Sequence, residues 1–97
     1  MKEMILTLEA QENIEDIEGY INNHYSVPNT VQEFRNHLER AVDVISKNPK
    51  IGTPYDAVVR KWVQNYYIHL YVAYRQSIRI LQISYERMNW QNYYQNR

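Results

Sequence analysis

The chain of 97 residues contains no cysteine and only two glycines, Gly19 and Gly52. Without cysteine there is no disulfide framework, no thiolate zinc site and no cysteine nucleophile, and a reducing cytoplasm suits such a chain. Two isolated glycines exclude a glycine-rich phosphate loop. No stretch approaches the roughly 20 apolar residues of a membrane span, and the apolar start at residues 4–8 is too short for a signal peptide. We therefore expect a cytoplasmic protein without a membrane partner.

Acidic residues are scarce in the second half of the chain. Residues 1–56 hold five basic and ten acidic residues, a balance of −5, whereas residues 57–97 hold six basic residues and only Glu86, a balance of +5. The formal net charge is therefore zero. This asymmetry predicts either a positive surface for an anionic partner or mutual neutralisation of the two halves within the fold.

The first half of the sequence predicts a short strand and two helices. The strand covers residues 4–8, and a helix from about Glu9 follows, with one apolar stripe formed by Ala10, Ile14, Ile17 and Ile21. Thr30 begins a T-x-x-E pattern that is typical of a capping box at a helix start. The Asn-Pro pair at 48–49 disfavours helical geometry, so the second helix should end near Lys47.

The second half predicts three strands, over 57–63, 66–74 and 77–85, because apolar and aromatic residues recur there with a period of two. The last strand is irregular: Ile78 and Ile80 occupy one face and then Leu81 and Ile83 the other. Either a bulge shifts the register or both faces are covered. We predict one α+β domain over residues 1–97, with the order β-α-α-β-β-β and a two-helix hairpin packed on one face of an antiparallel sheet. Residues 89–97 form either a final helical turn or a flexible tail.

Five motifs occur in a characteristic order. They are A-x-x-x-I-x-x-I-x-x-x-I at 10–21, I-S-K-N-P-K-I-G at 45–52, V-V-R-K-W at 58–62, Y-I-H-L-Y-V at 67–72 and S-I-R-I-L-Q-I-S-Y-E-R at 77–87. In this order and spacing they resemble the RelE/ParE family of toxins from bacterial type II toxin–antitoxin systems, and the resemblance extends from about residue 4 to residue 89.

The resemblance implies a growth inhibitor, with a role such as plasmid stabilisation, that a cognate antitoxin holds silent. Family antitoxins wrap the toxin with a helix and an extended strand and cover its hydrophobic groove, so a homodimer or a hetero-oligomer with the antitoxin is expected. ParE-like members inhibit DNA gyrase without known catalysis, and RelE-like members are mRNA interferases that cleave messenger RNA on the ribosome. The P-K-I-G element and the zero net charge favour the ParE-like function. A RelE-like endoribonuclease and an inactive antitoxin-binding relative are the alternatives.

The same resemblance implies the candidate site residues. If the protein is RelE-like, cleavage needs proton-transfer groups and cations around the phosphate, and the candidates are Arg60, Arg79, Tyr85 and Arg87. In a regular last strand, Arg79 and Tyr85 would share a face. Many family members have a histidine where this sequence has Tyr85. The candidates for target binding are Arg60, Lys61, Arg87 and Trp90.

No cofactor is expected. His69 is the histidine closest to these candidates, on the strand face that also carries Tyr67 and Tyr71. No second histidine or acid lies at ligand spacing from it, so the sequence predicts no metal site. An ordinary, partly buried histidine is the simpler interpretation.

Overall fold

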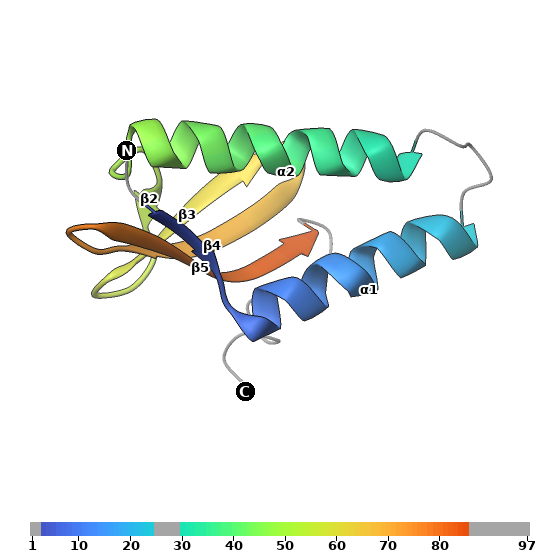
Figure 1. The fold of residues 1–97 in the computed structure, drawn as a ribbon, viewed down its shortest axis with the longest axis horizontal. Coiled ribbons are helices and arrows are strands. Elements are labelled where there is room, and N and C mark those ends of the chain that lie inside the picture. The colour runs from blue at the N-terminus through green and yellow to red at the C-terminus, as the bar shows by residue number, and fades with distance from the viewer. Residues whose placement is uncertain (1–2, 25–29, 86–97) are drawn as a thin grey trace.

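The computed structural model describes residues 3–24 and 30–85, in which two helices lie against one face of a five-stranded sheet (Figure 1). The elements in chain order are β1 (Glu3–Leu6), α1 (Leu8–His24), α2 (Thr30–Lys47), β2 (Thr53–Pro54), β3 (Val59–Gln64), β4 (Tyr67–Ala73) and β5 (Ser77–Tyr85). The sheet order is β1-β5-β4-β3-β2. The predicted α+β class and the predicted order of the main elements are confirmed.

The sheet is mixed, whereas the sequence predicted an antiparallel one. Strands β2 to β5 pair antiparallel with their chain neighbours, but β1 pairs parallel with β5, from Glu3 beside Ser77 to Leu6 beside Ile80. Parallel neighbours need a long connection, and here both helices and three strands separate the two. Strand β2 was predicted as loop. Its proline is tolerated because β2 is the edge of the sheet, where a missing N–H breaks no ladder.

Local hydrogen bonds explain why several boundaries differ from the predicted ones. Helix α2 begins and ends as predicted, at Thr30 and Lys47. Strand β1 stops at Leu6, because Thr7 caps α1: its Oγ1 accepts the N–H of Ala10 at 3.1 Å. Strand β3 begins two residues late, at Val59, whose carbonyl accepts the N–H groups of residues 55 and 56 at 2.8 and 3.2 Å.

The connection between β3 and β4 is a two-residue turn. Its residues Asn65 and Tyr66 have φ angles of 50° and 73°, so strand β4 begins at Tyr67 rather than at residue 66. Two consecutive left-handed residues are the geometry of a type I′ hairpin turn. Tyrosine is an unusual residue there, because its Cβ disfavours a positive φ.

A bulge in β5 decides which side chains face the helices. Leu70 pairs with Gln82 and Tyr71 pairs with Ile80, so Leu81 is an extra residue in β5. Beyond it the alternation is reversed. The core on the helix side is formed by Ala10, Ile45, Tyr71, Ile78, Ile80 and Ile83, and a second cluster on the opposite face is formed by Val59, Ile68, Leu70 and Val72.

Beyond the end of β1, the side chains of Thr7 and Asn13 form hydrogen bonds with the backbone of β5. The parallel pairing with β1 ends at Ile80. Beyond that point, Thr7 Oγ1 donates to the carbonyl of Leu81 at 3.1 Å, and the N–H of Ile83 donates to Asn13 Oδ1 at 3.0 Å. Asn13 is 7% exposed. A polar residue in the apolar stripe of α1 therefore satisfies a buried backbone donor.

Replacing Asn13 with alanine is expected to lower the free energy of unfolding by about 1–3 kcal/mol, because the buried N–H of Ile83 would lose its acceptor. Urea denaturation measures this loss, and amide hydrogen exchange at Ile83 should accelerate. Gln11→Ala is the matched control, since the Gln11 side chain bonds to the carbonyl of Leu6 at an exposed site. An equal loss in the two variants would contradict the role assigned to Asn13.

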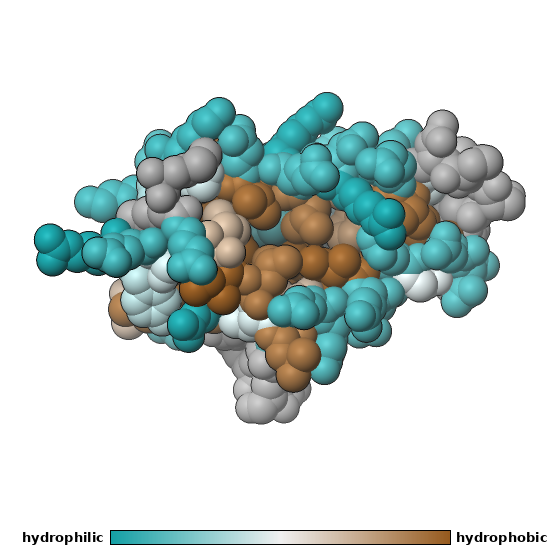
Figure 2. Space-filling view, in the orientation of Figure 1, coloured by the Kyte–Doolittle hydropathy of each residue, from teal (hydrophilic) through white to brown (hydrophobic). Residues whose placement is uncertain are grey.

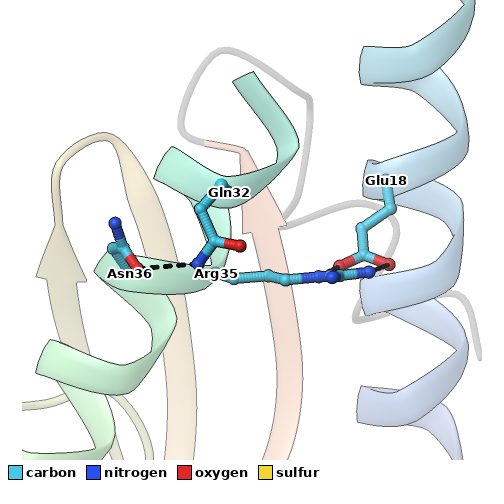
Figure 3. Close-up of polar contacts among 4 residues, drawn as sticks. All are labelled: Glu18, Gln32, Arg35 and Asn36. Atoms are coloured by element: carbon cyan, nitrogen blue, oxygen red, sulfur yellow. Dashed lines mark hydrogen bonds and ion pairs between the residues drawn. The ribbon is translucent and has the colours of Figure 1, made fainter. Parts of the chain in front are cut away.

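The two helices diverge from one another over the sheet. Helix α1 packs on β5 and α2 packs on β3. A bidentate ion pair joins them, with Arg35 Nε 2.7 Å from Glu18 Oε2, and its hydrogen bond raises the pKa of Arg35 (Figure 3). Both partners lie near the surface, so the pair contributes little to stability. Neither of these helices is long and apolar enough to cross a membrane.

Candidate functional site

The loop after α2 is held to the sheet by two side chains, an arrangement that we call the loop clamp (Arg60 and Tyr71 holding residues 49–52). Arg60 Nη1 donates to the carbonyl of Lys50 at 3.2 Å and to that of Gly52 at 2.8 Å. Tyr71 Oη donates to the carbonyl of Pro49 at 2.7 Å and accepts the N–H of Gly52 at 2.9 Å. The P-K-I-G segment therefore has a defined conformation.

Tyr71 reaches the loop from the centre of the sheet. Its ring is fully buried in the helix-side core. Burial raises the pKa of the Tyr71 phenol, while the Gly52 N–H and the charge of Arg60 act in the opposite direction. A neutral phenol can donate one hydrogen bond and accept another, which is what the two loop groups require.

Arg60, a predicted catalytic or target-binding residue, is part of the loop clamp. It pairs with Tyr71 across the β3–β4 ladder and is half-buried on the helix side of the sheet. Its guanidinium donates to backbone carbonyls, which gives Arg60 a structural role whether or not it also contacts a target.

The other candidates do not gather around Arg60. Arg79 pairs with Val72, so it lies on the sheet face opposite to the helices. Tyr85 pairs with Tyr67 on the helix side, and their ring centroids are 5.5 Å apart. The expectation that Arg79 and Tyr85 share a face is wrong, because it assumed a regular strand and the bulge at Leu81 reverses the alternation between them.

Lys61, the neighbour of Arg60 in β3, pairs with Leu70 and lies on the face of Arg79. The adjacent candidates Arg60 and Lys61 are thus on opposite faces, as alternation along a strand requires. Arg87 and Trp90 fall outside the described residues, so their proposed roles stay predictions.

His69 is more deeply buried than the sequence suggested. Its exposed fraction is 1%, and neither ring nitrogen has a well-aligned hydrogen bond within the described part of the chain. Burial lowers the pKa of His69 to about 4, and the nearby backbone of Trp62 and Tyr67 opposes that shift only in part. The ring is therefore neutral at physiological pH. Among residues 3–24 and 30–85, no group of three or more metal-binding side chains is present.

An apolar band lies between the two helices (Figure 2). We call it the inter-helix band; its partly buried members that pack on the core include Ile14 and Ile17 of α1 and Leu38 of α2. Ile14, Ile17 and Leu38 are only partly buried, so the band reaches the molecular surface. Contiguous apolar surface of this kind is typical of a protein–protein contact.

The sequence analysis missed Tyr71 and Gly52 as determinants of this region. One signal was available: Tyr71 alternates with apolar residues on a central strand, and a buried tyrosine hydroxyl needs a partner. The identity of that partner, a glycine 19 residues earlier in the chain, followed from no local pattern.

Comparison with known proteins gives a consistent result. Residues 4–90 match the family described as ParE toxin of type II toxin–antitoxin system, parDE. A solved structure described as the chromosomal ParDE TA system from P. aeruginosa superposes with a TM-score of 0.74 at 14% identity, covering 88% of this chain and 96% of that chain. At this identity the likeness shows the fold alone. No curated protein sequence matches.

Proposed function

Because the chain belongs to the ParE toxin family of type II toxin–antitoxin systems, we propose that it arrests bacterial growth in the cytoplasm by binding DNA gyrase. Its action requires no cofactor and no catalysis of its own. A cognate antitoxin neutralises it by forming a hetero-oligomer.

The dispersal of the candidate nuclease residues is the observation that most supports binding over RNA cleavage. Catalytic groups must converge within hydrogen-bond reach of one reacting phosphate. Here Arg60 and Arg79 lie on opposite faces of the sheet, and Arg60 already donates to two carbonyls. Tyr85 shares the helix side with Arg60, but it pairs with Tyr67 at the start of β4, whereas Arg60 pairs with Tyr71 further along the strand.

The inter-helix band supports the antitoxin as partner. An amphipathic helix that enters such a band buries its own apolar face and that of the toxin together. The acidic helix α1 at the border of the band favours a partner segment with basic residues on that side. Ile17→Glu is expected to weaken antitoxin binding, because it places a charge in the buried contact.

Induced expression in a bacterial host tests the proposed target. We expect growth arrest with DNA breaks and a DNA-damage response, intact messenger RNA, and rescue by the co-expressed antitoxin. Purified protein should inhibit supercoiling by gyrase. Codon-phased cuts in translated messages would instead establish a RelE-like nuclease, and normal growth with the folded protein present would leave an inactive antitoxin-binding relative.

Variants of the candidate residues need a stability measurement beside the toxicity assay. Arg60→Ala removes the hydrogen bonds to residues 50 and 52, so its loss of toxicity can arise from a displaced loop alone. Arg79→Ala also removes a positive charge but leaves the loop clamp intact. Comparing the two variants therefore distinguishes the effect of lost charge from the effect of a displaced loop. A thermal melt of each variant identifies which effect operates.

A further inference from the structure

Helix α1 and the strands β3 to β5 of this protein carry opposite charges. Residues 59–85, which form β3 to β5, contain four basic and no acidic residues, namely Arg60, Lys61, Arg75 and Arg79. Helix α1 contains five acidic residues and no basic one, namely Glu9, Glu12, Glu15, Asp16 and Glu18, whereas α2 is balanced, with Arg35, Arg40 and Lys47 against Glu33, Glu39 and Asp43. The acidic helix α1 lies on one face of the sheet, and Lys61 and Arg79 lie on the other, so the face away from the helices is the more positive one. Glu3 of β1, which pairs with Ser77, is the acidic residue among the strands.

Two of the arginines lie together at the β4–β5 hairpin. Arg75 is in the turn between the strands, and Arg79 is on β5, on the face away from the helices. Figure 1 shows this hairpin projecting from the left edge of the molecule. Both side chains are exposed. With Tyr74 they form what we call the hairpin patch (Tyr74, Arg75 and Arg79).

Within residues 3–24 and 30–85, both arginines of the hairpin patch are exposed, and the guanidinium group of Arg79 has an aromatic neighbour. Arg79 Cζ lies 5.5 Å from the ring centroid of Tyr74, which is 47% exposed. Arg79 is itself exposed, so solvent reaches its side chain beside the tyrosine ring. Neither arginine forms an ion pair with a carboxylate of residues 3–24 or 30–85. Arg60 differs from them because its guanidinium donates to the carbonyls of Lys50 and Gly52 in the loop.

We propose that the hairpin patch binds the phosphate backbone of duplex DNA. Exposed guanidinium groups bind phosphates with two parallel hydrogen bonds, and a two-stranded ribbon fits the major groove. A narrow projecting turn suits a groove better than it suits a flat membrane surface. The acidic helix α1 repels phosphates, so the protein meets DNA with the sheet face that is turned away from the helices. This contact goes beyond the proposed gyrase inhibition and does not depend on it.

Fluorescence anisotropy with a labelled DNA duplex tests the proposal. The purified full-length chain is titrated into the duplex at several salt concentrations. We expect a dissociation constant of roughly 10⁻⁴ to 10⁻⁶ M, weakening steeply with salt, as for sequence-independent contacts. Arg75→Ala and Arg79→Ala should each lower the slope of log affinity against log salt by about one, and together weaken binding by about tenfold.

Arg40→Ala is the matched control, because it removes one exposed arginine from α2, which lies on the helix side of the sheet. It is expected to change the affinity by no more than about twofold, since it lies away from the phosphates. Thermal melts of all variants verify folding. Equal losses in the Arg40 and hairpin variants would overturn the proposal, as would salt-independent binding or no binding. Preferential binding to vesicles of anionic phospholipid or to polyglutamate would also overturn it.

Discussion

Gly52→Ala is expected to lower the free energy of unfolding by about 2–4 kcal/mol, a large fraction of the stability of a small domain. A Cβ at this position would lie 2.7 Å from Tyr71 Oη, 2.9 Å from Tyr71 Cε1 and 2.9 Å from the carbonyl oxygen of Lys61. The tyrosine is fully buried and bonded to the loop, and the Lys61 carbonyl belongs to the β2–β3 ladder. Neither neighbour can move without breaking other contacts. Urea denaturation monitored by tryptophan fluorescence measures the loss.

Gly19→Ala provides a control with the same chemical change and the opposite expected sign. A Cβ at Gly19 meets nothing within 4 Å. Because Gly19 lies inside α1, alanine should stabilise the protein by about 0.5–1 kcal/mol through its higher helix propensity. If both glycine variants lost stability alike, the loop clamp would not be the cause.

A double-mutant cycle between positions 52 and 71 isolates the clash itself. Tyr71→Phe alone leaves the N–H of Gly52 and the carbonyl of Pro49 without their partner. The same change removes the oxygen that an alanine at position 52 would meet. The sum of the two single-variant losses in unfolding free energy should therefore exceed the loss in the double variant, because both substitutions act on one contact. Additive losses would mean that the destabilisation by Gly52→Ala does not arise from its contact with the Tyr71 hydroxyl.

Acid is expected to destabilise the wild-type protein through His69. Its pKa is about 4 in the folded protein against an ordinary value of 6.5, so between these values the unfolded chain binds the proton more readily. The stabilising contribution is complete above pH 6.5 and is lost as the pH falls toward 4. Over this pH window the unfolding free energy of the wild type should fall by about 3 kcal/mol through this residue, and a variant without the imidazole should not show this decrease.

The comparison of wild type with His69→Leu measures this contribution. Leucine fits the apolar surroundings and cannot titrate, and carboxylates that titrate in the same range cancel in the difference. The gap in unfolding free energy between the two proteins should shift by about 3 kcal/mol from pH 7.5 to pH 4. NMR titration of the imidazole should show a neutral ring down to about pH 5. A gap that does not change with pH would mean that the ring is hydrated or paired.

Helix–strand order and family membership were both predictable from the sequence. Helix α2 is defined by Thr30 and by the Asn-Pro pair, which are signals within a few residues of its ends. The strands β3 to β5 follow from period-two alternation. The resemblance to RelE/ParE toxins is confirmed for the ParE family by the match over residues 4–90. The gyrase target stays a proposal.

The candidate site was less predictable, because its geometry depends on which face each side chain occupies. Alternation predicts the face of a side chain only while the strand is regular. The extra residue at Leu81 places Arg79 and Tyr85 on opposite faces of the sheet. The irregular pattern in β5 did indicate a bulge or two covered faces. It did not indicate that the bulge lies between the two candidates.

The sequence by itself determined the two helices, the strands β1 and β3 to β5, their order and the charge difference between the two halves of the chain, since these properties belong to single segments. Only the tertiary structure decided the parallel pairing of β1, the loop clamp and the partner of Asn13. These contacts join groups 19 residues apart for Gly52 and Tyr71, and 70 residues apart for Asn13 and Ile83. The physical reason is that a buried donor or a close backbone approach is defined by packing between distant segments, and no local periodicity records it.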